Sequence, residues 1–239
     1  MAFGPDPRVM RGGVAAAERI DEGLRSYMLS VYNYMGLGLA LTGIVAFLVA
    51  STPALYVPIF TTPLKWVVML APLGFVFFLG MRIQKMSLSA AQLTFWAFAA
   101  VMGLSLASIF LVFTGASIAR VFFITAATFG GMSLYGYTTK RDLSGWGSFL
   151  FMGLIGIIIA MVVNIFLMSS ALQFAISVIG VLVFTGLTAY DTQRIKEMYY
   201  EVDSSEIAGK KAIMGALSLY LNFINLFMML LQLFGQTRE

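Results

Sequence analysis

The chain has 239 residues, of which 60% are hydrophobic and only 11% are charged, and its net charge is +4. A soluble domain carries about a quarter charged residues, so this composition indicates an integral membrane protein with the lipid bilayer as its main partner. Cysteine and histidine are absent, which excludes disulfides, thiol catalysis and histidine metal ligands. The small net charge does not indicate nucleic-acid binding.

The segment before the first long apolar run is polar and charged. Within it and into the run, a series of apolar residues recurs at helical spacing, which predicts an amphipathic lead-in helix at the membrane surface. This series consists of Ile20, Leu24, Tyr27, Met28 and Val31. We therefore expect a cytosolic N-terminal segment, residues 1–27, followed by one transmembrane domain, residues 28–239. Charged residues precede any long apolar run, so no signal peptide is expected.

Seven apolar stretches follow, each long enough for the roughly 20 residues that a helix needs to cross a bilayer. They cover roughly residues 28–50, 64–84, 92–114, 118–138, 147–168, 172–196 and 212–234. Short separators that contain helix breakers join them. The predicted fold class is an all-α membrane protein with seven transmembrane helices.

Lysine and arginine are distributed unevenly over the separators. Twelve of the 15 lie before the first stretch or around the separators that follow the second, fourth and sixth stretches, whereas Lys65, Arg120 and Arg238 lie on the other side. Cytoplasmic loops of membrane proteins carry an excess of lysine and arginine. This rule places the N-terminus in the cytoplasm and the C-terminus outside.

One carboxylate, Asp191, lies near the end of the sixth apolar stretch. A charged side chain at membrane depth costs about 2.5 kcal/mol or more, so such residues are usually retained for a function. If the sixth helix continues to about Tyr200, Asp191 lies roughly ten residues, or about 15 Å, from the loop. On the seventh helix, Asn222 lies at nearly the same depth, counted from Lys211. Because consecutive helices are antiparallel neighbours, we expect Asp191 and Asn222 to face each other.

Further polar residues share the helix faces of this pair. Thr188 lies on the Asp191 face, and Ser218 and Asn225 lie on the Asn222 face. They are candidates to line a polar pathway, although such residues more often form hydrogen bonds between helices. Arg82, at the end of the second stretch, is the expected ionic partner of Asp191. An equally good interpretation is that Arg82 only anchors the helix end, by extending its charged group to the membrane–water interface.

Two segments resemble the signature of the Bax-inhibitor (transmembrane Bax-inhibitor-motif) family, in its bacterial branch. They are residues 188–196, TAYDTQRIK, and residues 216–227, ALSLYLNFINLF. Residues 140–144, KRDLS, and the pair Met81 and Arg82 also resemble family landmarks. The resemblance implies a bacterial inner-membrane protein whose central seventh helix is surrounded by six others. It also implies a pH-sensitive calcium leak that two facing aspartates gate and an arginine of the second helix latches.

In this resemblance Asp191 matches the first aspartate and Arg82 matches the latch, whereas Asn222 stands where the family has the second aspartate. The predicted function is a cation leak, with Ca²⁺ as the expected ion. Because one titratable carboxyl group remains, the pH dependence should be weaker than that of an aspartate pair. The asparagine carbonyl can still contact a hard cation, so Asp191 and Asn222 are expected to form a weak, transient Ca²⁺ site. No other cofactor is expected.

The main alternative is a protein that does not transport. Some bacterial members of the resembled family are associated with a membrane-anchored ATP-dependent protease, and a modulator or partner of that protease would not need the second aspartate. Residues 1–13 offer such a protease a handle, or are an ordinary terminus. We find no catalytic constellation in the sequence and expect no enzyme. An intramembrane aspartyl protease would need a carboxylate where Asn222 stands.

Overall fold

The computed structural model describes the backbone of residues 7–238 and the side chains of residues 22–238. Within that range, seven helices are long and apolar enough to cross a membrane, which confirms the predicted fold class. They are α1 (Pro7–Ser51), α3 (Leu64–Arg82), α4 (Leu88–Val112), α5 (Gly115–Thr138), α6 (Ser144–Leu167), α7 (Ser170–Glu197) and α8 (Ser205–Phe234). Two short helices, α2 (Pro53–Thr61) and η1 (Ile83–Lys85), lie in the connections.

Side-chain caps determine where several of these helices begin. The residue before the helix accepts a hydrogen bond from the backbone N–H three positions later, which satisfies a group that the helix itself leaves free. The capping residues are Ser87 for α4, Thr114 for α5, Ser169 for α7 and Ser204 for α8. Because only Phe113 and Thr114 separate α4 from α5, the chain reverses sharply and the two helices run antiparallel.

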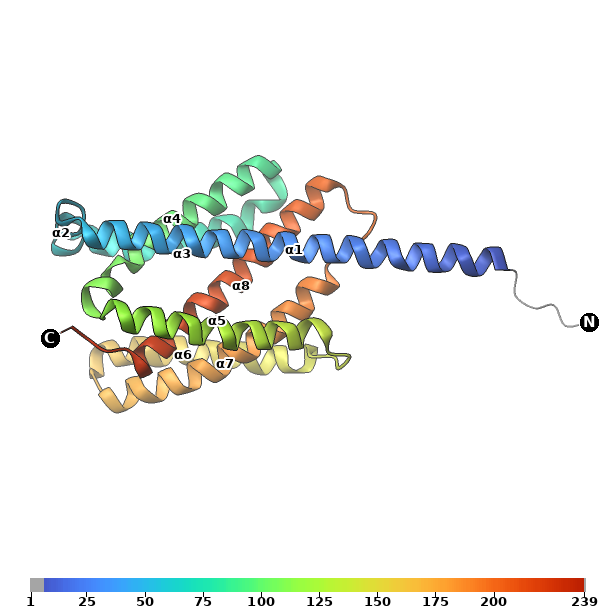
Figure 1. The fold of residues 1–239 in the computed structure, drawn as a ribbon. Coiled ribbons are helices and arrows are strands. Elements are labelled where there is room, and N and C mark those ends of the chain that lie inside the picture. Colours follow the sequence, from blue (N-terminus) through green and yellow to red (C-terminus); the bar gives the residue numbers. More distant parts are fainter. Residues whose placement is uncertain (1–6, 239) are drawn as a thin grey trace, which may run out of the picture.

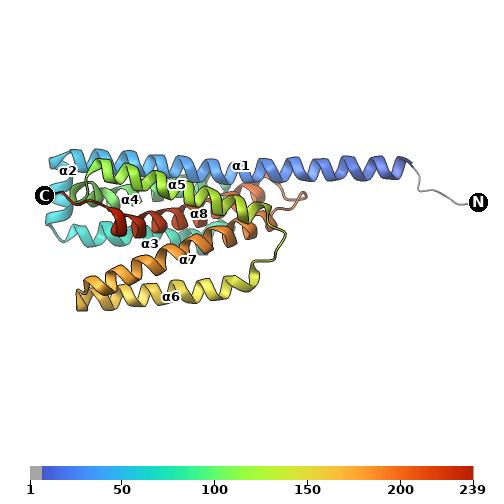
Figure 2. The same ribbon diagram turned by 60° about the horizontal axis from the view of Figure 1, so that its bottom comes forward.

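Helix α8 is the central element of the bundle and the most buried of the seven spans. Helices α1, α4, α5 and α7 pack directly against it, while α3 packs mainly on α4 and α6 packs mainly on α7. The side chains of Tyr220 and Leu226, on α8, are fully buried. The seventh span is therefore central, as expected, and the other six surround it as four inner and two outer helices (Figures 1 and 2).

The two ends of the bundle differ in charge. The α3–α4, α5–α6 and α7–α8 connections meet at one end, and the N-terminal part of α1 projects beyond that end (Figure 1). We call it the charged end, because most charged residues of the connections lie there. They are Arg82, Lys85, Lys140, Arg141, Asp142, Arg194, Lys196, Glu197, Glu201, Asp203, Glu206, Lys210 and Lys211.

The predicted lead-in helix is not a separate element. Helix α1 continues without a break through the expected boundary at residue 27. Tyr27, Met28 and Val31 are buried in the bundle, so this part of the apolar series packs on protein. Residues 1–6 of the expected protease handle lie outside the described residues, and residues 7–13 form the start of α1.

Candidate functional site

A cavity of about 420 Å³ lies between α6, α7 and α8, on the side of the bundle nearer the charged end. Helix α6 contributes Ser148 to its polar lining, and the other polar groups come from α7 and α8. These groups are Tyr190, Asp191, Arg194, Ser218 and Asn222. Three of the residues singled out in the sequence, Asp191, Ser218 and Asn222, thus line one cavity, and Asp191 is the carboxylate among the lining residues.

Asp191 and Asn222 face each other across the α7–α8 interface, as predicted. The side-chain amide of Asn222 donates a hydrogen bond from Nδ2 to Oδ2 of Asp191, over 2.7 Å. Asn222 is buried, whereas Asp191 is half-buried. Among the described side chains, only the hydroxyl groups of Tyr27 and Thr185 are fully buried polar atoms without a hydrogen-bond partner. Oδ1 of Asp191 is not one of them, so it is not cut off from the cavity. One carboxylate oxygen is thus held by Asn222, and the other remains available to the cavity.

Asp191 lies closer to the charged end of the bundle than the sequence predicted. Helix α7 ends at Glu197 and not near Tyr200, so six residues, or about 9 Å of helix, separate Asp191 from that end. The predicted distance of about 15 Å is therefore wrong. The chain turns early because Lys211 Nζ donates to the carbonyl oxygen of Met198, at 2.9 Å, and to Asp203 Oδ2, at 2.6 Å.

The arginine that lines the cavity is Arg194, and not the expected latch Arg82. Arg82 is exposed at the end of α3, which packs on α4 and not on the three helices of the cavity. Among the described residues it makes no ion pair with Asp191, so the predicted latch contact is absent from this arrangement. Arg194 follows Asp191 by three positions on α7, a spacing that places both on one helix face. That spacing is the sequence signal that identifies Arg194.

Two of the predicted lining residues do not line the cavity. Thr188 Oγ1 donates to the carbonyl oxygen of Phe184, at 2.8 Å, and Asn225 Nδ2 donates to that of Leu221, also at 2.8 Å. Each side chain thus bonds to the preceding turn of its own helix. Thr188 and Asn225 are therefore absent from the lining of this cavity, and their place in a conducting pathway stays a prediction.

Gln193, which the sequence reasoning did not single out, fixes the connection between α5 and α6. Its Oε1 accepts a hydrogen bond from the backbone N–H of Leu143, and its Nε2 donates to the carbonyl oxygen of Arg141, each over 2.8 Å. The side chain is buried, so these two bonds are made away from water. Gln193 therefore positions the start of α6 and, with it, the α6 wall of the cavity.

A glycine allows α6 to approach α7 beside Asp191. A Cβ atom at Gly147 would lie 2.6 Å from Cζ of Tyr190, closer than side chains tolerate. Gly147 thus leaves room for the Tyr190 ring, and both residues line the cavity. The absence of a side chain here sets the distance between the two helices.

Towards the opposite end of the bundle the cavity is bounded by apolar side chains. Leu154 and Leu187 line it on that side. Further along the three helices, Ile157, Val183 and Met229 are buried. In this conformation the cavity therefore ends at an apolar layer and does not cross the bundle.

The cavity offers few ligands to a resident metal ion. Calcium takes about six to eight oxygen ligands, and tight sites use several carboxylates. Asp191 provides one carboxylate, and Asn222, Ser148 and Ser218 provide neutral oxygens. These oxygen ligands are fewer than a tight calcium site uses.

The chain matches a protein-family model and is similar to several bacterial proteins over most of its length. Residues 24–239 match the family described as "Inhibitor of apoptosis-promoting Bax1". The chain is 52% identical to an uncharacterized protein of Rickettsia prowazekii, over 92% of this chain and 93% of the relative. It is 50% identical to the inner membrane protein YbhL of Escherichia coli K12, over 90% of this chain and 94% of the relative. An uncharacterized protein of Caulobacter vibrioides is 48% identical over 92% of both chains.

Proposed function

This chain belongs to the family of inhibitors of apoptosis-promoting Bax1, and from this premise we propose that it is an inner-membrane cation leak. The observation that carries the proposal is the cavity in which Asp191, held by Asn222, is the lining carboxylate. The membrane assignment is supported by the seven apolar spans and by the similarity to an inner membrane protein of Escherichia coli.

A cation enters the cavity from the charged end and meets Asp191. The free Oδ1 of Asp191 and the carbonyl oxygen of Asn222 replace part of its hydration shell. To continue, the ion needs the apolar layer of Ile157, Val183 and Met229 to separate, so this conformation is the closed state of the leak. Ca²⁺ is the proposed ion, because hard oxygen ligands suit it.

The pH dependence follows from the charges in the cavity. When Asp191 is ionised, its charge balances that of Arg194, and the cavity is close to neutral. Protonation of Asp191 leaves Arg194 unbalanced, and a net positive charge repels cations. Acidification should therefore reduce the flux, with the slope of a single proton because one carboxyl group titrates.

The proposed orientation places the charged end in the cytoplasm, in accordance with the positive-inside rule. The absence of cysteine makes this simple to test with single-cysteine variants. A membrane-impermeant maleimide added to intact cells should label Gln236→Cys and not Lys140→Cys. The reverse pattern would invert the orientation.

Flux through reconstituted vesicles tests the leak itself. Asp191→Asn removes the charge but keeps the size, and we expect it to reduce Ca²⁺ flux at neutral pH by about ten-fold or more, equivalent to about 1.4 kcal/mol. The control is Glu201→Gln, which removes an exposed charge in the α7–α8 connection and should leave the flux unchanged. Equal flux through the parent protein and Asp191→Asn would disprove the proposed path.

The second candidate is a non-transporting partner of a membrane-anchored ATP-dependent protease. The apolar layer that closes the cavity and the amide at Asn222 favour it, because a regulator needs neither a path nor an aspartate pair. Vesicles without flux, together with co-purification of such a protease from membranes, would support this candidate over the leak.

A further inference from the structure

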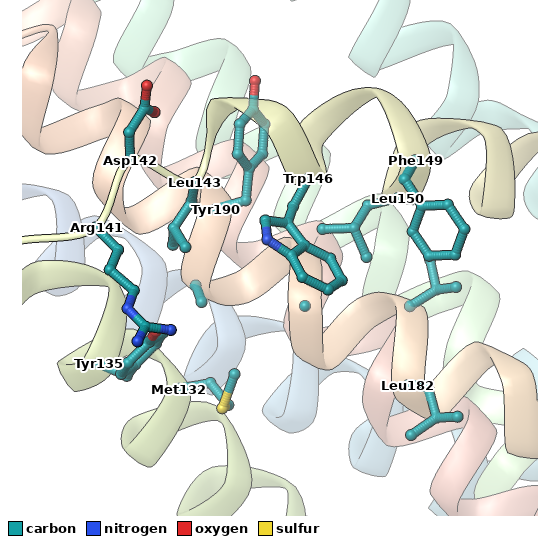
Figure 3. Close-up of a pocket in the computed structure, with 13 residues that line it drawn as sticks. Met132, Tyr135, Arg141, Asp142, Leu143, Trp146, Phe149, Leu150, Leu182 and Tyr190 are labelled. Carbon is teal, nitrogen blue, oxygen red and sulfur yellow. The ribbon is translucent and has the colours of Figure 1, made fainter. Parts of the chain in front are cut away.

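A second cavity, of about 440 Å³, lies on the outer surface of the bundle between α5 and α6 (Figure 3). Both helices pack against α7, which forms the floor of the cavity. We call it the α5–α6 groove, and its walls and floor are largely apolar and aromatic. The residues that matter most are Met132, Tyr135, Trp146, Phe149, Leu150 and Leu182.

The apolar side of the groove faces outward at membrane depth. Trp146 and Phe149 are each 62% exposed, and Leu182 is 68% exposed. Helix α6 is also the span with the smallest buried fraction, since it packs mainly on α7. In a bilayer, lipid chains and not water cover such a surface. The groove therefore offers an apolar surface along which an acyl chain can pack.

The end of the groove nearest the charged end is polar and carries one basic side chain, Arg141, and one acidic side chain, Asp142, which point in different directions. Arg141 extends its guanidinium towards Tyr135, whereas the carboxylate of Asp142 points away from it (Figure 3). Asp142 Oδ1 accepts a hydrogen bond from the backbone N–H of Ser144, at 2.8 Å. Hydrogen bonding to the Ser144 side chain, and to a lesser degree to its backbone N–H, holds the pKa of Asp142 below its ordinary value. Among the described residues, Arg141 makes no ion pair.

The position of Arg141 is fixed by the protein core. Its carbonyl oxygen accepts the hydrogen bond from Gln193, and the N–H of Leu143 donates to the same side chain. The connection that carries the guanidinium is thus anchored to α7, the floor of the groove. Tyr135 and Trp146 lie near the same end, where aromatic side chains commonly meet lipid headgroups.

We propose that the α5–α6 groove is a binding site for an anionic phospholipid of the leaflet at the charged end. Its phosphate contacts Arg141, and one acyl chain lies along Phe149 and Leu182. A lipid is the occupant that combines a negative headgroup with a chain long enough to fill the apolar part. This proposal does not depend on the cation leak.

Fluorescence quenching by brominated lipids tests the proposal, because Trp146 lies in the groove and only two other tryptophans exist. In the reporter protein Trp66 and Trp96 are replaced by phenylalanine. It is placed in phosphatidylcholine vesicles that contain equal fractions of chain-brominated phosphatidylglycerol or chain-brominated phosphatidylcholine. We expect the anionic lipid to be preferred about five-fold, the factor expected for one basic residue at an anionic surface.

Substitutions at two neighbouring residues distinguish binding at a specific site from attraction by the general surface charge. Arg141→Gln should reduce the preference to about one, whereas Lys140→Gln, which removes the adjacent exposed charge outside the groove, should leave it near five-fold. The proposal is overturned if both lipids quench equally in the reporter protein, or if both substitutions have the same effect. It is also overturned if millimolar glycerol phosphate removes the preference, because the site would then recognise a free phosphate and not a lipid.

Discussion

Asn222 donates a hydrogen bond to Asp191 across the α7–α8 interface, and this contact occupies one of the two oxygens of the carboxylate that lines the cavity. The amide neither repels the carboxylate nor titrates. The contact therefore holds the pair together without a bound cation, and the cavity contains one carboxyl group and not two.

Asn222→Asp should convert the site into a carboxylate pair. Two carboxylates at hydrogen-bonding distance cannot both ionise easily, so they share a proton and titrate in two separate steps. We expect Ca²⁺ flux through vesicles to depend more steeply on pH between pH 5 and 8 than it does in the parent protein. An unaltered pH profile would show that position 222 does not take part in gating. Asn225→Asp is the matched control, because Asn225 bonds within its own helix outside the cavity.

Arg194 and Arg82 should differ in their effect on flux. Arg194 lines the cavity with Asp191, so Arg194→Gln leaves the carboxylate charge unbalanced and should raise Ca²⁺ flux several-fold at neutral pH. Both arginines are exposed, but Arg82 lies on α3, which packs mainly on α4, and it does not line the cavity. Arg82→Gln should therefore change the flux by less than about two-fold. A large effect of Arg82→Gln alone would mean that the conducting state brings α3 to Asp191.

Gln193→Ala should destabilise the protein by about 1–3 kcal/mol. The substitution leaves the N–H of Leu143 and the carbonyl oxygen of Arg141 without the partner that now satisfies both in a buried setting. Thermal unfolding in detergent, followed by circular dichroism, measures the effect. Gln84→Ala, at an exposed position in η1, should leave the midpoint nearly unchanged. Equal midpoints for the two variants would exclude the anchoring role of Gln193.

Gly147→Ala tests the close approach of α6 to α7. The added methyl group would lie 2.6 Å from the Tyr190 ring, so the ring or the helix must move, at a cost of about 1–3 kcal/mol. Gly156→Ala, in the middle of the same helix, meets nothing within 4 Å and should stabilise α6 by about 0.5–1 kcal/mol. The two alanine variants should therefore shift the unfolding midpoint in opposite directions, and a common direction would contradict the packing described for Tyr190.

Much of this protein is determined by its sequence alone. The lengths and apolarity of the seven stretches, together with the unevenly placed lysines and arginines, give the number of spans and their alternation, since a bilayer admits few other arrangements. The pairing of Asp191 with Asn222 also follows from the sequence, because the short α7–α8 connection makes these two helices antiparallel neighbours. The hydrogen bond between them confirms it.

Only the tertiary structure decided that Thr188, Asn225 and Arg82 do not share the cavity with Asp191. Thr188 and Asn225 have suitable helical spacing, but each side chain donates a hydrogen bond to the backbone of its own helix. Helical spacing alone does not predict this hydrogen bond. Arg82 is distant because α3 packs on α4, whereas Arg194 is close because it follows Asp191 on one face. Sequence periodicity gives the face of a helix, but which neighbour covers that face depends on the packing of all seven helices together.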